Sequence, residues 1–353
     1  MSSTVLSPCI HSIVLTIPPS AFASLDAATG NLKLPSQFNQ AIVDSIHAGN
    51  PRRPKAILSV GGYYETNFSP IFNNNTLRQN FVNSTINTIQ QYGLDGIDID
   101  WEYPGRAGIS NNYLSVDSAN FVLGLKALKT GLNAKGVLAS ISATSLPYGF
   151  IGADGNYLTD LSGYAANLDF LNIMGYDLNG GSWTTSSAPN APLGTPLNGD
   201  KSAGGIDGSI QKLIKAGFPA NKLVLGVPFY GRYVKTVQSM ATNGPNNQAA
   251  SSNSGQPGAW IDYSAITSPA YSTDGPDVLL YKTLQMFVQN PENNLIQYFD
   301  NATMTPWFYD IANSVYVTYD NPLSIYVKGS YAACMGLKGV FAWEATHDNN
   351  MLL

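Results

Sequence analysis

Short apolar runs alternate along this chain with longer segments in which apolar residues recur at every third or fourth position. The short runs are rich in β-branched residues and predict buried strands, whereas the longer segments predict amphipathic helices, several of which end at glycine. This alternation is typical of strand–helix units and a parallel sheet. Seven strands are predicted near residues 11, 56, 94, 137, 168, 223 and 339, and helices are predicted over 37–48, 76–91, 117–130, 207–216 and 324–335.

One span interrupts the alternation. Between residues 231 and 294 the chain is rich in Asn, Gln, Ser, Gly and Pro, but it also contains Trp260, Tyr263 and a helix-like run near 279–288. A loop of this length without secondary structure is uncommon inside a compact domain. We therefore predict a strand–helix domain of residues 1–232 and 295–353, and a small inserted subdomain of residues 233–294 that walls one side of the functional site.

The segment Leu94–Gly105, with the sequence LDGIDIDWEYPG, carries acids at alternate positions. Side chains two apart on a strand point to the same face, with a spacing of about 6.6 Å. Asp98, Asp100 and Glu102 are therefore predicted to form a ladder on one face. Apolar residues lie between the acids, so the other face is also buried and the strand is interior. Trp101, on that other face, is expected to pack against helices.

Buried carboxylates this close together are costly unless they share protons or bind a cation. Repulsion between them raises at least one pKa, which produces a carboxylic acid that can donate a proton near neutral pH. Glu102 ends the ladder, just before a turn, and has the longest side chain, so it is the candidate general acid. The spacing of the acids alone also leaves open a site for Mg²⁺ or Ca²⁺.

Two arrangements of the parallel sheet are compatible with the alternation, a closed (β/α)8 barrel and an open doubly wound sheet. An open sheet usually carries a glycine-rich phosphate loop after its first strand, and this chain has none there. Inward-facing acids at the carboxyl end of one strand suit the barrel, whose active sites lie at that rim. We therefore predict the barrel.

Composition excludes several classes of partner. The chain has 353 residues with a net charge of -5 and only 12% charged residues, and no block of Lys or Arg. Binding to a phosphate backbone requires a basic stripe, so no nucleic-acid partner is expected. No apolar run reaches the roughly 20 residues of a membrane span. The two cysteines, Cys9 and Cys334, lie near opposite ends of the chain. One disulfide is possible, two separate buried thiols are favoured, and neither pattern predicts a metal site.

The N-terminus, MSSTVLSPC, lacks the charged and apolar regions of a signal peptide. The chain nevertheless contains acceptor triplets for N-glycosylation. We expect an extracellular protein whose leader is absent from this chain. The triplets begin at Asn67, Asn74, Asn83 and Asn301.

The acid segment, together with Asp95, resembles the DxxDxDxE signature of the family 18 glycoside hydrolases, the chitinases. The resemblance extends over roughly residues 10 to 348, is similar to fungal members, and rests on further motifs in the family's order. These are Ser59-Val-Gly61-Gly62 (SxGG), Met174-Gly-Tyr176-Asp177 (MxYD), the run from Gly226 to Arg232, Tyr319-Asp320-Asn321-Pro322, and Phe341-Ala-Trp343-Glu344.

The resemblance implies a (β/α)8 TIM barrel with an α+β insertion after the seventh strand. Compared with the family pattern, this chain begins after the first strand and stops where the last helix should begin, so we expect a barrel that lacks both. Ser59, Gly61 and Gly62 are expected to serve tight packing beside the acid strand and not chemistry.

By resemblance, hydrolysis is substrate-assisted, with retention of configuration. Glu102 acts as acid and then base, Asp100 holds the N-acetyl N–H, and Asp98 shares a proton with Asp100. Tyr176 donates to the acetyl oxygen and Asp177 binds a sugar hydroxyl. The sugar ring stacks on Trp343, because a tryptophan face suits the apolar face of a sugar. The remaining implied substrate contacts are Tyr103, Tyr230, Met174 and Arg232.

Three activities fit the resemblance. The first is an endo-acting chitinase that cleaves β-1,4-linked N-acetylglucosamine polymers, without a cofactor or metal and as a monomer. The second is a non-hydrolytic lectin on the same scaffold, and the third is an endo-β-N-acetylglucosaminidase acting on glycoproteins. Retention of Glu102 favours an enzyme, and the insertion, which deepens the cleft, favours a linear polymer.

Overall fold

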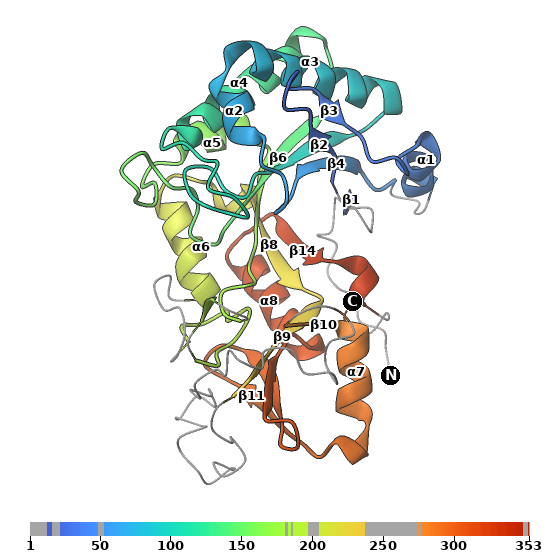
Figure 1. Ribbon diagram of the computed structural model, residues 1–353, viewed down its shortest axis with the longest axis vertical. Helices are drawn as coiled ribbons and strands as arrows, with labels where there is room; N and C mark the ends of the chain where they lie inside the picture. Colours follow the sequence, from blue (N-terminus) through green and yellow to red (C-terminus); the bar gives the residue numbers. More distant parts are fainter. Residues whose placement is uncertain are drawn as a thin grey trace. The chain divides into compact units, whose positions relative to one another are not determined.

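The computed structural model describes residues 13–15, 22–48, 53–180, 183–184, 186–196, 205–236, 274, 277–348 and 352 (Figure 1). The chain divides into two compact units. The first comprises Met1–Ile173, Leu213–Val224 and Leu337–Gly339, and the second comprises Met174–Lys212, Leu225–Gly336 and Val340–Leu353.

A sheet of seven strands carries the acid ladder. Its order is β1-β4-β5-β6-β7-β8-β14, and the pairs from β1 to β7 are parallel. The order follows the chain without the reversal that defines a doubly wound sheet. All seven predicted strands are confirmed. They are β1 (Ile13–Leu15), β4 (Ala56–Gly61), β5 (Gly96–Asp100), β6 (Ser140–Ser145), β7 (Phe170–Ile173), β8 (Leu223–Pro228) and β14 (Gly339–Trp343).

The five predicted helices are also confirmed, with ends that differ by a few residues from the prediction. They are α1 (Gln40–Ala48), α3 (Asn75–Tyr92), α4 (Asp117–Ala134), α6 (Gly205–Lys215) and α8 (Pro322–Cys334). Two single-turn helices, which are too short to show a clear period, were not predicted: α2 (Phe68–Asn73) and α5 (Ser162–Asn167). The remaining short elements are β2 (Ser24–Leu25), β3 (Leu32–Lys33), and 3-10 turns at Ala220–Lys222, Pro291–Asn293 and Ala345–His347.

The face of β5 opposite the acids packs against α2 and α4. Trp101 is only 5% exposed, and its ring stacks on Phe68 of α2 at 5.3 Å between centroids. The rings of Phe72 and Phe121 lie at 5.4 and 5.3 Å from it. The predicted packing of Trp101 against helices is therefore confirmed, and this aromatic cluster anchors the end of β5 that carries Glu102.

Asp117 is a buried acid at the start of α4. It is the first residue of the helix, and its carboxylate accepts hydrogen bonds from Leu114 N at 2.8 Å and Gly105 N at 3.4 Å. Its other oxygen accepts one from Ser69 Oγ at 2.8 Å. Asp117 is buried, and burial raises its pKa. The side chain thus fixes the loop that follows the acid strand.

Asp95 lies in the turn before β5. Its carboxylate accepts hydrogen bonds from Ala56 N at 2.9 Å and Arg53 Nη1 at 2.9 Å, and pairs with His47 Nε2 at 2.8 Å. This carboxylate therefore ties the start of β5 to the start of β4. His47 is thus a structural histidine with a hydrogen-bond partner, whereas His11 and Cys9 lie outside the described residues.

An antiparallel sheet of five strands forms the core of the second unit, in the order β10-β9-β13-β12-β11. Helix α7 (Tyr281–Gln289), shown in orange in Figure 1, packs on it through Leu284, which contacts Tyr233 and Phe308. The predicted insertion limits, 233–294, stay a prediction, because 237–273, with Trp260 and Tyr263, fall outside the described residues. The strands are β9 (Tyr230–Lys235), β10 (Val278–Leu280), β11 (Leu295–Asp300), β12 (Thr305–Asp310) and β13 (Val315–Thr318).

Within the described ranges, no helix is both long and apolar enough to cross a membrane. Cys334, the last residue of α8, is an exposed free thiol, so the expectation of a buried thiol was wrong for this residue.

A buried ion pair supports the start of α8. Lys328 and Asp320 are both fully buried, with Nζ at 2.6 and 2.7 Å from the two carboxylate oxygens, and Ser324 Oγ donates to Asp320 at 2.6 Å. Burial lowers the pKa of Lys328, and the Asp320 charge opposes that shift.

Lys328→Met is expected to lower the free energy of unfolding by about 3–5 kcal/mol, because it leaves the Asp320 charge buried without a cation. Urea unfolding at neutral pH measures the change. The double variant Lys328→Met/Asp320→Asn should recover most of the loss. If the double variant is as unstable as the single one, the loss comes from packing and not from the orphaned charge.

Candidate active site

The acid ladder lies as predicted on one face of β5. Asp98 is 2% and Asp100 is 7% exposed, and Glu102 is half-buried just beyond the end of the strand. Gly61 and Gly62 allow β4 to approach this strand closely, because a Cβ on Gly61 would lie 2.1 Å from the Asp100 carbonyl oxygen. Gly62 N donates to that oxygen at 2.8 Å. The packing role predicted for the two glycines agrees with this contact.

Asp98 is the hub of a hydrogen-bond network drawn from three other strands. Each of its carboxylate oxygens accepts two hydrogen bonds, which satisfies the capacity of the group. One oxygen accepts hydrogen bonds from Ser142 Oγ at 2.6 Å and Asn172 Nδ2 at 3.0 Å. The other accepts them from Ser59 Oγ at 2.9 Å and Thr144 Oγ1 at 3.4 Å.

Register explains this network, since Ser59, Asp98 and Ser142 are direct partners in the parallel ladder. The expectation that Ser59 serves packing alone was wrong, because its hydroxyl holds an acid of the ladder. Sequence reasoning missed Ser142, Thr144 and Asn172. The only local signal for them is a polar residue at alternate positions in a strand that is otherwise apolar.

The electrostatics of the two aspartates differ. Burial raises the pKa of Asp98, and its four hydrogen bonds oppose that shift. Burial raises the pKa of Asp100 far more, helped by the charges of Glu102 and Asp98. Asp100 Oδ1 is buried and has no hydrogen-bond partner within the described chain. The prediction that crowding raises at least one pKa is therefore confirmed in direction, with burial as the larger cause.

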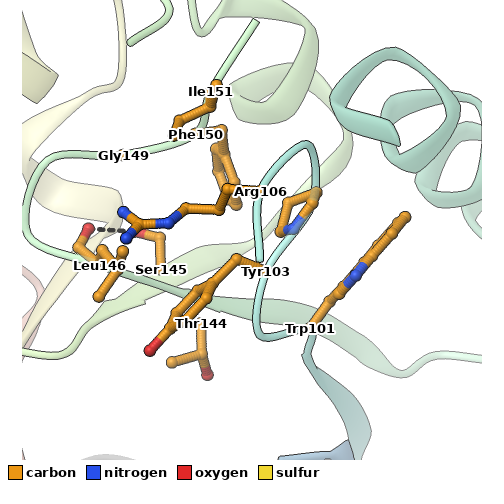
Figure 2. Close-up of a pocket in the computed structure, with 10 residues that line it drawn as sticks. Trp101, Tyr103, Arg106, Thr144, Ser145, Leu146, Gly149, Phe150 and Ile151 are labelled. Carbon is orange, nitrogen blue, oxygen red and sulfur yellow. Dashed lines mark hydrogen bonds between the residues drawn. The ribbon is translucent and has the colours of Figure 1, made fainter. Parts of the chain in front are cut away.

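Tyr103 and Arg106 lie in the loop that follows Glu102. Burial, followed by the charge of Glu102, raises the pKa of Tyr103 well above its usual value. Figure 2 shows Tyr103 and Arg106 in a small pocket, with Arg106 extending toward Ser145 and Leu146. The guanidinium carbon lies 5.4 Å from the centre of the Tyr103 ring.

A second polar cluster lies in the second unit and includes several predicted substrate contacts. Asp177 Oδ1 accepts hydrogen bonds from Tyr230 OH at 2.8 Å and Arg232 Nε at 2.9 Å. Arg232 Nη1 donates to Asp277 at 2.7 Å, and its guanidinium lies 5.0 Å from the Trp183 ring centre. Asp177 is exposed, and Trp183 is 49% exposed. Sequence reasoning identified neither Asp277 nor Trp183.

The remaining predicted contacts are also in this unit. The Tyr176 ring packs edge-on to Tyr230 and Phe341, with centroids 6.1 and 6.3 Å apart. Trp343 is half-buried at the end of β14, and Met174 is 9% exposed. The structure therefore groups Asp98, Asp100, Glu102 and Tyr103 in the first unit and groups Tyr176, Asp177, Tyr230 and Arg232 in the second.

Comparisons with known proteins agree with the geometry. The family model described as "Glycosyl hydrolases family 18" matches residues 14–348. Chitinase A1 of Niallia circulans is 30% identical over 349 residues, which cover 92% of this chain but 46% of that protein, so the chain spans about half of that relative. A chitinase-like effector of Moniliophthora perniciosa is 29% identical over 344 residues, which cover 93% of this chain and 77% of that protein.

Solved structures are similar over nearly the whole chain. A chitinase from Rhizomucor miehei has a TM-score of 0.81 and 26% identity, over 99% of this chain and 94% of its own. A chitinase from Cycas revoluta in complex with (GlcNAc)3 has a TM-score of 0.73 and 26% identity, over 93% of this chain and 87% of its own. These similarities confirm the predicted (β/α)8 barrel with an added small sheet.

Proposed function

Because this chain belongs to family 18 of the glycosyl hydrolases, we propose that it hydrolyses chitin, the β-1,4-linked polymer of N-acetylglucosamine. The observation that carries the proposal is the ladder on β5. Its inner members are two buried aspartates with raised pKa values, and its outer end is a half-buried glutamate. A buried set of carboxyls that shares protons is suited to acid–base chemistry.

In the proposed reaction, Glu102 gives a proton to the glycosidic oxygen as the bond from that oxygen to the anomeric carbon breaks. The acetamide oxygen of the same sugar forms the new bond to the anomeric carbon, which gives an oxazolinium ion. Water then adds to the anomeric carbon as the bond from the acetamide oxygen to that carbon breaks, and the water passes a proton to Glu102, so that the acetamide is restored and the product retains its configuration. No cofactor enters this scheme.

Asp98 and Asp100 have different roles in this reaction. Asp98 accepts four hydrogen bonds from neutral donors, which stabilise its charged form and hold it in place. Asp100 has a raised pKa and carries the proton, while its unpartnered Oδ1 is available to accept the N–H of the acetamide. The Asp98 charge also favours the positive charge that develops on the substrate during attack.

The polar cluster of the second unit is proposed to bind sugar. Tyr176 donates to the acetyl oxygen, Asp177 accepts a sugar hydroxyl, and Trp343 offers a flat face to the ring. Asp177 is already held by Tyr230 and Arg232, so its position is fixed before substrate arrives. Met174, Tyr103, Tyr230 and Arg232 are the other proposed contacts.

The decisive experiment is an assay of this chain on a chitin hexamer, with products followed by mass and by anomeric NMR. Shorter oligomers that first appear as the β anomer support retaining hydrolysis. Products of the α anomer would contradict substrate assistance. A high-mannose glycoprotein assayed in parallel tests the endo-β-N-acetylglucosaminidase alternative.

A non-hydrolytic lectin is the second candidate, and the similarity to a chitinase-like effector favours it. Calorimetric binding of the hexamer without turnover over a day would support the lectin. Turnover would exclude it. The same preparation, run on a sizing column with light scattering, tests the proposed monomer of 37.7 kDa.

We also propose that the protein is extracellular. Three of the acceptor asparagines, Asn74, Asn83 and Asn301, are exposed. Asn67 is half-buried, and the hydroxyl of its acceptor serine, Ser69, is buried in a hydrogen bond to Asp117. Expression behind a leader in a eukaryotic host should give glycans at the exposed sites, detected by mass after endoglycosidase treatment. Secreted protein without any glycan would remove this support.

A further inference from the structure

We propose that Asn190 and Thr318 are positioning residues for Asp177. Asn190 holds the backbone of Asp177 in a left-handed conformation, and Thr318 holds Asn190. Both act through Asp177 and do not contact substrate themselves. The inference rests on the proposed function, because that function assigns the Asp177 carboxylate to a sugar hydroxyl.

The first observation is the backbone conformation of Asp177. Its φ is 57°, in the left-handed region. Glycine adopts this region readily, whereas other residues do so at a cost in free energy, which is lower for aspartate than for most. Such a conformation persists only where the surrounding structure fixes it, and it is found most often at functional sites. The groups that hold Asp177 in this conformation are therefore of functional interest.

Two consecutive backbone amides bind Asn190. Asp177 N donates to Asn190 Oδ1 at 2.8 Å, and Leu178 N donates to Asn190 O at 3.0 Å. The two rotatable backbone bonds of Asp177 lie between these amides, so that anchoring both amides restricts its φ and ψ. Because a backbone N–H can only donate, the side-chain oxygen of Asn190, and not its nitrogen, faces Asp177.

Asn190 is itself buried and fixed. It is only 1% exposed, and its N donates to Thr318 Oγ1 at 3.1 Å. The preceding carbonyl, Pro189 O, accepts a hydrogen bond from Asn179 Nδ2 at 2.9 Å. Asn190 Nδ2, in contrast, is buried and has no hydrogen-bond partner among the described residues. Burying an unpaired donor costs free energy, and the need for the side-chain oxygen at Asp177 explains why an asparagine stands here.

Strands β9 and β13 hold both the backbone and the carboxylate of Asp177. Thr318 is the last residue of β13 and lies opposite Arg232 of β9 in the antiparallel ladder. Arg232 Nε donates to Asp177 Oδ1 at 2.9 Å, while Thr318 holds Asn190. The Asp177 side chain is nevertheless 39% exposed. The small sheet therefore orients this carboxylate and leaves it accessible to a ligand.

The first test is the split between KM and kcat on a chitin oligomer. Asn190→Ala is expected to raise KM about 10-fold and to leave kcat within about threefold, because a hydroxyl contact made in the ground state and the transition state alike contributes to binding. Thr318→Val should raise KM to a smaller extent. Asn190→Asp keeps an oxygen acceptor and should bring KM back to within about threefold of the wild type. Asn133→Ala, at an exposed position of α4, is the control and should change neither constant.

A double variant decides whether Asn190 acts through Asp177. Asp177→Gly removes the carboxylate and adopts the left-handed conformation readily. If Asn190 acts through Asp177, adding Asn190→Ala to Asp177→Gly leaves KM unchanged. The same factor in KM with and without the Asp177 carboxylate would overturn the assignment, as would an unchanged KM in Asn190→Ala that melts as a folded protein. If Asn190→Ala does not fold, Thr318→Val is used in the same comparison.

Hydrogen exchange without substrate keeps a second test independent of the proposed function. The Asp177 amide is bonded to a buried acceptor and should exchange slowly in the wild type. Asn190→Ala is expected to speed its exchange by about 10-fold or more, with the amides of β5 unchanged as an internal reference. This result is expected even if the wild type turns over no chitin oligomer, which would count against the proposed function alone. Equal exchange of the Asp177 amide in the wild type and Asn190→Ala would overturn the inference.

Discussion

Replacing Glu102 by glutamine is expected to lower kcat on a chitin oligomer by about 10²–10⁴-fold, the range that a positioned acid–base group supplies. Glutamine has nearly the same size as glutamate, but it cannot transfer a proton. Because Glu102 is half-buried at the end of β5, the amide should leave the strand and its aromatic anchor undisturbed. Stopped assays for kcat and calorimetry for oligomer binding separate the two effects.

Binding of the oligomer by Glu102→Gln should stay within about threefold of the wild type, since the substitution removes an interaction made in the transition state. Glu292→Gln, at an exposed position in a 3-10 turn, is the matched control and should leave kcat unchanged. Turnover by Glu102→Gln at the wild-type rate would remove Glu102 from the acid–base role.

The acid ladder shows what a single segment predicts about a site. The alternation of Asp98, Asp100 and Glu102 with apolar residues was enough to predict a shared face and a buried opposite face, since both follow from the period of a strand. The same alternation predicted that the Trp101 side chain packs against helices. These features are local, and the structure confirms them.

The partners of the ladder were not predictable in the same way. Whether Ser59, Ser142 and Asn172 reach Asp98 depends on the register of four strands, which the period of one strand does not give. Asp277 accepts a hydrogen bond from Arg232, which lies 45 residues earlier in the sequence. Most of the residues between them show no periodic pattern of apolar positions.

The antiparallel sheet of the second unit was missed for a related reason. Its strands β11, β12 and β13 lie in a part of the chain that the sequence analysis assigned to the barrel. Strand β13 pairs with the distant strand β9, so that Val315 lies opposite Lys235. Pairing over such a separation is set by tertiary contacts and not by local pattern. The parallel strands were easier to predict, because each is a continuous apolar run followed by a helix.

Asp100→Asn is expected to lower kcat by about 10²-fold while making the protein more stable at neutral pH. The rate falls because an amide cannot share the proton and charge of the ladder as the acetamide attacks. The stability rises because burial and the neighbouring charges raise the pKa of Asp100 above its ordinary value of 3.8. The folded protein then binds a proton that the unfolded chain releases, so Asp100 costs stability progressively as the pH rises above 3.8.

Asparagine has no such cost, so the difference in unfolding free energy between Asp100→Asn and the wild type should be small below pH 3.8 and should grow as the pH rises toward 7. Urea unfolding at several pH values measures it, and Asp44→Asn, at an exposed position of α1, is the control for the loss of one carboxylate. A rate within twofold of the wild type would count against substrate assistance. A difference that does not depend on pH would mean that Asp100 is not held protonated in the folded protein. Asp100 is predicted both to weaken the fold and to serve the reaction, so Asp100→Asn should lower kcat and raise the free energy of unfolding. Replacing a residue with a structural role alone would not raise stability while lowering the rate.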